Sequence, residues 1–137
     1  KEAACRATWV DKATLLREAD FLVLLLPYST ESHHIIGAAE LALMKPSAHL
    51  INVARGGIVD DAALISALRQ RRLSGAALDV FEKEPPDPGN PLFVLPNVLC
   101  TPHIGSSTTR AAAQMGQIGF VSQKAARDQA RHPTRHG

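Results

Sequence analysis

The chain has 137 residues, of which 45% are hydrophobic and 20% charged; this balance is typical of one globular domain and excludes a disordered or collagen-like chain. Its longest strongly apolar run, 21–26, is far shorter than the roughly 20 residues of a membrane helix, and no signal-peptide pattern precedes it, so we expect a cytoplasmic protein with no membrane partner. The formal net charge of +2 arises in the segment 123–137, which holds four basic residues against one Asp and no aromatic residue, so we expect a flexible basic tail and no nucleic-acid partner.

Short apolar runs alternate with helical patterns along the chain. In chain order, these patterns predict a helix over 12–19, a strand over 21–26, a helix over 38–44, a strand over 49–53, a helix over 60–71, strands over 76–80 and 97–101, and a helix from 107 to about 126. The helix over 60–71 is the clearest, because acidic residues stand at its start and arginines at its end. Continuous apolar strands joined by helices predict an α/β fold, with a parallel sheet covered on both faces and right-handed crossovers.

The cysteines and paired histidines do not form a metal-binding pattern. Cys5 and Cys100 lie in apolar segments without C-x-x-C spacing, and we expect both to be reduced core residues. His33 and His34 are adjacent in the sequence, and no third ligand stands at a suitable spacing, so we expect them on the surface of a loop or helix end. The sequence therefore predicts no metal site.

Polar and glycine residues follow each predicted strand. Because ligands of an open parallel sheet bind outside the carboxyl ends of its strands, these positions are the candidate site. They are Pro27 after the first strand; Ala54, Arg55, Gly56 and Gly57 at the second; Asp79 and Glu84 at the third; and His103 and Gly105 at the fourth.

This set of side chains suits the reduction of a ketone next to a carboxylate. A histidine paired with a carboxylate stays protonated near neutral pH and can deliver a proton, and an arginine grips a planar carboxylate with two prongs. Neighbouring glycines let the backbone approach a flat ligand. The hydride must come from a cofactor, since no side chain supplies one.

Each residue also has a simpler interpretation when taken alone. Arg55 and Glu84 are equally typical of exposed surface charges, and Asp79 of a residue that caps a turn. A hydrolase built from Ser106, His103 and Glu84 lacks the G-x-S-x-G turn that such enzymes use. The joint occurrence of these residues at strand ends is what favours a functional site.

Three segments carry a family resemblance. The segments NVARGGIVD (52–60), GAALDVFEKEP (75–85) and TPHIGS (101–106) together resemble the D-isomer-specific 2-hydroxyacid dehydrogenase family. The resemblance implies that Arg55 binds the carboxylate and carbonyl of the substrate, that His103 is the acid/base, and that Glu84 keeps the histidine charged. It also implies a cofactor, NAD or NADP, held by Pro27, Val53, Ala54, Arg55, Asp79, His103 and Gly105, with Asp79 at the nicotinamide carboxamide.

The chain also departs from the pattern of this family. It contains no G-x-G-x-x-G, and the strand end that distinguishes NAD from NADP is missing as well. We therefore expect a partial Rossmann-type, doubly wound parallel sheet that lacks the N-terminal glycine-loop unit. It should form an incomplete NAD(P)-binding domain over 1–122, with a C-terminal helix, followed by the tail over 123–137.

The expected function follows from the resemblance. The segment 31–41 is similar to the branch of glyoxylate, hydroxypyruvate and 2-ketogluconate reductases, which implies reduction of such a 2-keto acid to the D-2-hydroxy acid with NAD(P)H. We expect the isolated chain to be poorly active, and relatives that dimerise through this domain make a homodimer an expectation. Two alternatives stay open: an NAD(P)-sensing interaction module, and an inactive truncated remnant.

Overall fold

The computed structural model describes residues 7–105 and 107–109 of the chain. The chain divides into two compact units, residues 1–103 and 104–137. All the strands and complete helices described below belong to the first unit. The predicted helix from 107 to about 126 and the basic tail lie, apart from 107–109, outside the described residues, and the boundary predicted at residue 122 stays a prediction.

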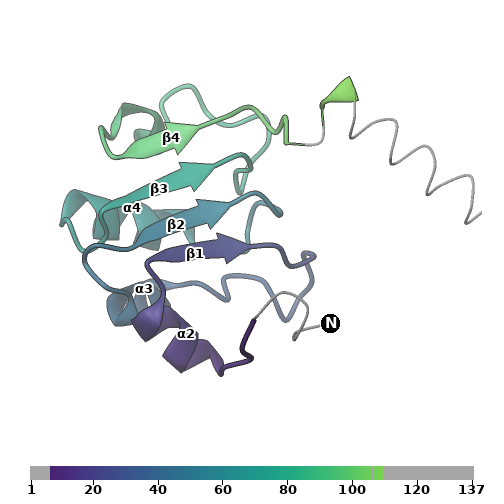
Figure 1. The fold of residues 1–137 in the computed structure, drawn as a ribbon. Helices are drawn as coiled ribbons and strands as arrows, with labels where there is room; N and C mark the ends of the chain where they lie inside the picture. The colour runs from purple at the N-terminus through teal and green to yellow at the C-terminus, as the bar shows by residue number, and fades with distance from the viewer. Residues whose placement is uncertain (1–6, 106, 110–137) are drawn as a thin grey trace, which may run out of the picture. The chain divides into compact units, whose positions relative to one another are not determined.

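A four-stranded parallel sheet forms the centre of the first unit (Figure 1). Its strands lie side by side in chain order and are β1 (Phe21–Leu24), β2 (His49–Asn52), β3 (Gly75–Leu78) and β4 (Val98–Cys100). The register places Val23, Ile51, Ala77 and Leu99 in one row across the sheet. The four predicted strands and their parallel direction are confirmed. Every carboxyl end points to the same edge, as the arrowheads in Figure 1 show.

The strands are joined by short helices with recognisable caps. The helices are α2 (Lys12–Glu18), α3 (Ala38–Leu43) and α4 (Asp61–Arg69), and a 3₁₀ turn, η1 (Pro91–Val94), precedes β4. The Asp60 carboxylate accepts a hydrogen bond from the Ala63 N–H at 3.0 Å and so begins α4 one residue later than predicted. The helix ends at Arg69, and Arg71 has a φ of 53°, a conformation that no helix continues through.

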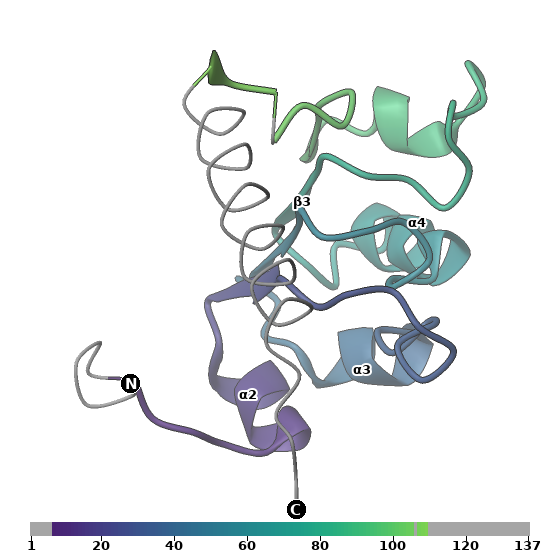
Figure 2. The same ribbon diagram turned by 90° about the vertical axis from the view of Figure 1, so that its right-hand side faces the viewer.

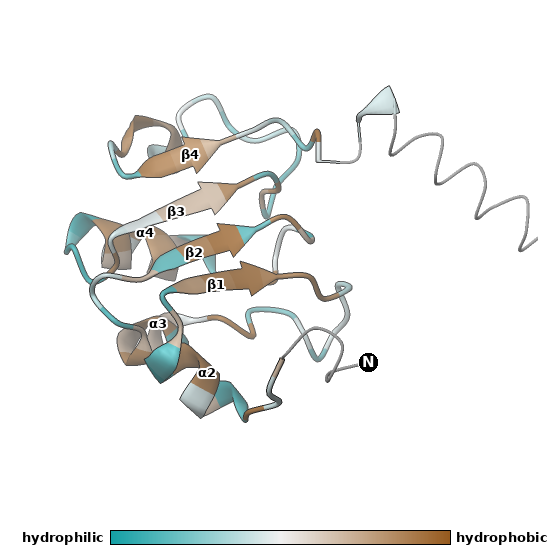
Figure 3. Ribbon diagram, viewed as in Figure 1, coloured by the Kyte–Doolittle hydropathy of each residue, from teal (hydrophilic) through white to brown (hydrophobic). Residues whose placement is uncertain are grey.

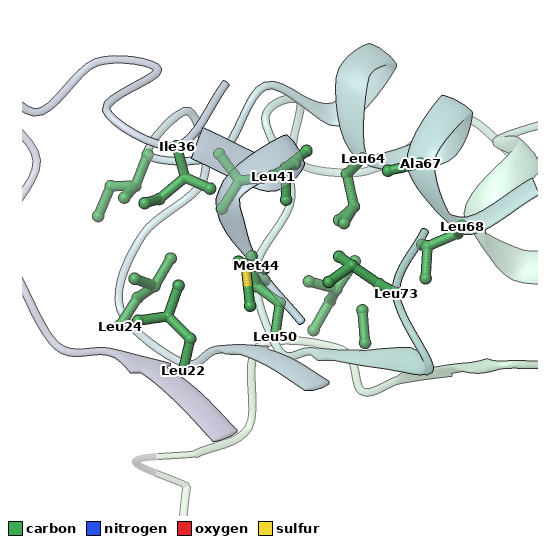
Figure 4. Packing of buried hydrophobic residues seen from close by; sticks show 14 of the residues in the cluster. Leu22, Leu24, Ile36, Leu41, Met44, Leu50, Leu64, Ala67, Leu68 and Leu73 are labelled. Atoms are coloured by element: carbon green, nitrogen blue, oxygen red, sulfur yellow. The ribbon is translucent and has the colours of Figure 1, made fainter. Parts of the chain in front are cut away.

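The hydrophobic core lies between the sheet and its helices. Figure 2 shows α3 and α4 on one side of the strands. Leucines from the strands meet leucines from these helices there, and Figure 4 shows how they interdigitate. The labelled members of this cluster are Leu22, Leu24, Ile36, Leu41, Met44, Leu50, Leu64, Ala67, Leu68 and Leu73.

The helices of the described residues cover one face of the sheet, and the expectation of two covered faces was wrong for this part of the chain. Phe21 is 65% exposed and Leu99 66% exposed on the opposite face. The reason is topological: when neighbouring parallel strands follow chain order, every right-handed crossover passes over the same side. Figure 3 shows that β1 and β4 are hydrophobic along their whole length nevertheless. Over the described residues, no helix has the length and apolar character needed to cross a membrane.

Candidate active site

The three predicted catalytic residues meet in one pocket at the carboxyl edge of the sheet. Arg55 follows β2, Glu84 follows β3 and His103 follows β4, so the parallel topology brings them together. The open pocket has a volume of about 480 Å³. Its lining consists of Tyr28, His33, Arg55, Gly56, Gly57, Phe81, Glu82, Glu84 and His103.

His103 and Glu84 form a close pair in this pocket. Nδ1 of His103 lies 2.7 Å from Oε2 of Glu84, and because an ionised carboxylate only accepts, the ring N–H is the donor. The other oxygen of Glu84 accepts from the Phe81 N–H at 3.0 Å. The hydrogen bond from His103 holds the pKa of Glu84 below its usual value, against a smaller opposing effect of burial. The pair is therefore a carboxylate and an oriented imidazole.

The backbone of His103 adopts an unusual conformation. Its φ is 54°, in the left-handed region that most residues avoid, and its N–H donates to the Thr101 carbonyl at 3.1 Å. This tight turn directly after β4 aims the imidazole toward the loop of Glu84. The side chains of His103 and Glu84 remain 42% and 35% exposed, and both line the pocket, so a ligand there can reach the pair.

Arg55 is held in place through its backbone. The buried side chain of Asn52, at the end of β2, donates to the Arg55 carbonyl at 3.1 Å and accepts from the Ala54 N–H at 3.2 Å. The Arg55 guanidinium donates through Nη1 to the Ala54 carbonyl at 2.7 Å, and the Arg55 residue lines the pocket. The turn therefore offers a cation to a ligand in the pocket.

Glycine is required immediately after Arg55. A Cβ atom on Gly56 would lie 1.7 Å from the carbonyl oxygen of Phe81, which no real pair of atoms can do. The absence of a side chain lets the Arg55 turn pack directly against the loop that carries Glu84. The arginine and the His103–Glu84 pair are therefore fixed relative to each other.

Three further predicted residues, Val53, Ala54 and Asp79, lie at the same sheet edge but do not line this pocket. Asp79 is buried, and its carboxylate accepts from Oγ1 of Thr101 at 2.5 Å. Its N–H donates to the Asn52 carbonyl at 3.0 Å, which ties the end of β3 to the end of β2. Ala54 is buried, whereas Val53 is 45% exposed and presents an apolar side chain at the edge.

The last two predicted residues, Pro27 and Gly105, belong to different units of the chain. Pro27 is exposed, and its carbonyl accepts from the Ser32 hydroxyl at 3.0 Å. Gly105 belongs to the second unit of the chain, so its position relative to the pocket is not defined.

Sequence reasoning missed four residues of the pocket, of which Phe81 and Glu82 belong to the loop before Glu84. Tyr28 and His33 both line it, and the Tyr28 hydroxyl lies 3.2 Å from Nδ1 of His33. Behind them, the His34 ring stacks on His33 at 3.8 Å, and its Nε2 lies 2.9 Å from Oε1 of Glu82. One signal could have found them, because they follow the first strand just as Arg55 and His103 follow later ones. Among the described residues, no three His, Cys, Asp or Glu side chains form a group that could hold a metal ion.

An apolar hollow flanks the other side of the His103–Glu84 pair. It has a volume of about 440 Å³ and is lined mainly by Phe81, Pro85, Pro86, Phe93 and Pro102. Apolar walls lower the local dielectric constant and strengthen a hydrogen bond beside them. The pair thus lies between a polar pocket and an apolar one.

Comparison with known proteins decides the family. Residues 1–105 match the family model for the D-isomer specific 2-hydroxyacid dehydrogenase, NAD binding domain. The chain belongs to this family. The predicted resemblance and the Rossmann-type α/β class are both confirmed.

Individual relatives of the 2-hydroxyacid dehydrogenase family agree with this result. The chain is 51% identical to the glyoxylate/hydroxypyruvate reductase B of Enterobacter agglomerans over 107 residues, which cover 78% of this chain and 33% of that protein. The NAD-complexed D-isomer specific 2-hydroxyacid dehydrogenase of Lactobacillus delbrueckii ssp. bulgaricus is similar in structure, with a TM-score of 0.82, 33% identity, and coverage of 98% of this chain and 45% of that one.

A third relative was solved with both a cofactor and a small acid. The NADPH-dependent glyoxylate/hydroxypyruvate reductase of Sinorhizobium meliloti, in complex with NADP and malonate, has a TM-score of 0.69 and 36% identity, with coverage of 77% of this chain and 31% of that one. The chain spans about a third of the length of the curated relatives it matches.

Proposed function

We propose that this chain carries the proton-transfer and carboxylate-binding residues of an NAD(P)-dependent reductase that converts a small 2-keto acid, such as glyoxylate, hydroxypyruvate or 2-ketogluconate, to the D-2-hydroxy acid. The observation that carries the proposal is the 2.7 Å contact between His103 and Glu84 in a pocket that Arg55 also lines. A proton donor and an anion-binding group are thus directed at one cavity, as a keto acid requires.

The carboxyl edge of the sheet fits a nicotinamide cofactor. The half-exposed apolar Val53 side chain and the Asp79 carboxylate lie at neighbouring strand ends, a combination suited to a flat ring that bears an amide. Pro27, Val53, Ala54, Arg55, Asp79 and His103 are the residues that would hold it, together with Gly105 as the family resemblance implies, and the cofactor supplies the hydride when bound. The NAD and NADP complexes of two solved relatives support this assignment.

In the proposed reaction, Arg55 binds the carboxylate of the keto acid. A guanidinium matches a carboxylate with two parallel N–H donors, so it fixes both the position and the rotation of the acid. The backbone bonds from Asn52 and the close packing of Gly56 hold the arginine beside the proton donor. The substrate is therefore oriented with its keto oxygen toward His103.

His103 supplies the proton. Its Nδ1 is engaged by Glu84, so Nε2 is the atom that gives a proton to the keto oxygen as the oxygen gains negative charge. The lowered pKa of Glu84 keeps that carboxylate ionised through neutral pH, where it stabilises the charged ring before transfer. In the direction of oxidation, the neutral ring takes the proton from the hydroxyl group.

A single substitution tests the proposed function. In the protein expressed from its native reading frame, His103→Gln should lower kcat/KM for glyoxylate and hydroxypyruvate by roughly 100- to 10,000-fold, the usual contribution of a general acid. His49→Gln is a matched control, because His49 opens β2 at the opposite end of the strand. Turnover of His103→Gln within twofold of the parent would overturn the assignment.

The same assay separates the alternatives. Binding of NADH or NADPH without turnover of any 2-keto acid would favour a cofactor-sensing interaction module. Absence of both binding and turnover would favour an inactive remnant. We further infer a reducing compartment such as the cytoplasm, which the free thiol of Cys100 supports, and a homodimer, which light scattering of the purified protein tests.

A further inference from the structure

We propose that Tyr28 and His33 form a specificity-determining pair that hydrogen-bonds a hydroxyl group on C3 of the 2-keto acid. The pair would favour hydroxylated substrates over alkyl 2-keto acids of the same length. This inference rests on the proposed function, because it assigns a binding partner to the C3 group of the substrate, which Arg55 and His103 do not bind. Both residues line the same pocket as Arg55 and His103.

The position of the pair relative to Arg55 is set by the backbone. The His34 N–H donates to the Gly57 carbonyl at 2.8 Å, and Ile36 N–H donates to the Ile58 carbonyl at 3.2 Å. Arg55 stands two residues before Gly57. These bonds therefore tie the segment after β1 to the turn that carries Arg55. The Tyr28–His33 pair therefore belongs to the wall of the pocket.

The segment that carries the pair is also internally bonded. The buried Ser32 hydroxyl accepts from the Ser29 N–H at 2.7 Å and donates to the Pro27 carbonyl at 3.0 Å. The His33 ring is held from two sides, by the edge of Tyr28 at a centroid distance of 5.9 Å and by the face of His34 at 3.8 Å. These contacts fix the positions of Tyr28 and His33 relative to each other.

Gly57, in the turn beside the pair, leaves space for the Tyr28 ring because it has no side chain. Gly57 has a φ of 76°, and a Cβ atom there would lie 2.9 Å from Cε2 of Tyr28 and 3.6 Å from Nδ1 of His33. The tyrosine ring thus packs against the backbone of the Arg55 turn. A side chain at this position would push the Tyr28 ring away from the Arg55 turn.

The chemistry of the pair matches an alcohol. A phenol oxygen has one donor and two acceptor positions, and a neutral imidazole has one donor and one acceptor, so their mutual contact leaves capacity for a further hydrogen bond. A hydroxyl group both donates and accepts, and it is small enough for the pocket of about 480 Å³. Once the carboxylate binds Arg55 and the keto oxygen faces His103, the C3 substituent is the group that meets the remaining wall.

Two substrates that differ by a single hydroxyl group provide the test. Hydroxypyruvate and pyruvate share their length, carboxylate and keto group, so their ratio of kcat/KM isolates the C3 hydroxyl. In the protein expressed from its native reading frame, we expect Tyr28→Phe to lower this ratio by about 3- to 10-fold, the effect of losing one uncharged hydrogen bond in a half-exposed site.

Two further variants keep the test decisive. His33→Phe retains an aromatic ring for stacking on His34 but removes both ring nitrogens, and it should lower the same ratio. Thr30→Val is the matched control, because it removes a hydroxyl group from the same loop at a residue that does not line the pocket. We expect the ratio of Thr30→Val to equal that of the parent.

The outcomes distinguish this inference from the proposed function. If the parent reduces both substrates and the ratio is unchanged in Tyr28→Phe and His33→Phe, the pair does not read the hydroxyl, although the proposed function stands. An equal loss with both substrates would show a positioning role and would also overturn the inference. A parent protein that reduces neither substrate would overturn the proposed function and, with it, the inference.

Discussion

Gly56 and Phe81 lie so close that the backbone of one occupies the space where a side chain of the other would begin. A Cβ atom on Gly56 would meet the Phe81 carbonyl carbon at 2.4 Å as well as its oxygen at 1.7 Å. Through this contact, the turn of Arg55 and the loop of Glu84 share one rigid boundary. The geometry of the pocket depends on it.

Gly56→Ala should therefore separate the two loops. We expect a loss of kcat/KM of at least about 10-fold, because a displacement of about 1 Å at reacting groups costs on the order of 100-fold in rate. The melting temperature should fall as well. Gly37→Ala is a suitable control, since a Cβ atom there would meet its nearest neighbour at an ordinary 3.6 Å. Equal activity of the two variants would show that the contact does not position the site.

Glu84→Gln should reduce catalysis without changing the shape of the loop. The amide can still accept from the Phe81 N–H, but it carries no charge to stabilise the imidazolium of His103. We expect kcat for keto acid reduction to fall by about 10- to 1,000-fold, with a smaller change in KM. Steady-state kinetics with glyoxylate measure both constants. A variant in which KM alone rises would instead place Glu84 in substrate binding.

The hydrogen bond between His103 and Glu84 should also leave a signature in the pH dependence of stability. The pKa of Glu84 is below its ordinary value of 4.5 in the folded chain, mainly because of the hydrogen bond from His103. A carboxyl with a lowered folded-state pKa stabilises the fold above its unfolded-state pKa, and this contribution disappears as the pH falls through the folded-state value.

Urea unfolding of the parent and of Glu84→Gln measures this effect. The parent should be the more stable at neutral pH, and the difference between the two should vanish below the ordinary carboxyl range. A difference that stays constant down to about pH 3 would mean that ionisation of Glu84 is not its cause.

The N-terminus of α4 should depend on a single carboxylate. Asp60 accepts from the Ala63 N–H, and its own N–H donates to the Ile36 carbonyl at 3.0 Å. Asp60→Ala should lower the free energy of unfolding by about 1 kcal/mol, the usual cost of a lost N-cap. Asp20→Ala removes an exposed carboxylate that pairs with Lys45 on the surface, so it should change the free energy far less. Similar losses in the two variants would contradict the capping role.

The two faces of the sheet should respond differently to truncation. Leu50 is fully buried among the helices, and Leu50→Ala should cost about 2 to 5 kcal/mol of unfolding free energy. Leu99, on the opposite face, is 66% exposed, and Leu99→Ala should cost less than about 1 kcal/mol. Denaturant unfolding of the two variants gives the comparison. A large loss in Leu99→Ala would show that the opposite face is covered in solution.

The strands and the polar residues that follow them could be predicted because both depend on local patterns. Apolar runs bounded by turn residues located β1 and β2, and parallel topology then brought Arg55, Glu84 and His103 to one edge. The turn η1 was missed, since its Pro91-Leu-Phe-Val segment depends on the Asn90 side chain, which accepts from the Leu92 N–H at 3.0 Å.

Contacts between distant segments could not be predicted in the same way. Tyr28 and His33 line the pocket because the His34 N–H donates to the Gly57 carbonyl, 23 residues further along the chain. The spacing of hydrophobic residues does not predict such a bond. The single covered face of the sheet has a similar origin. It depends on the order in which the strands lie, which the apolar runs alone do not specify.

The four residues from Phe81 to Glu84 contact four separate parts of the chain. The backbone of Phe81 abuts Gly56, the Glu82 N–H donates to the Asp61 carboxylate at 3.4 Å, the Glu82 carboxylate pairs with His34, and Glu84 pairs with His103. A one-residue insertion here would shift the spacing between the two carboxylates and break these contacts together. Within the described part of the chain, the hydrogen bonds of the turn at 87–90 run within the turn and to η1, so we expect the length of the chain to vary there at less cost to the catalytic geometry.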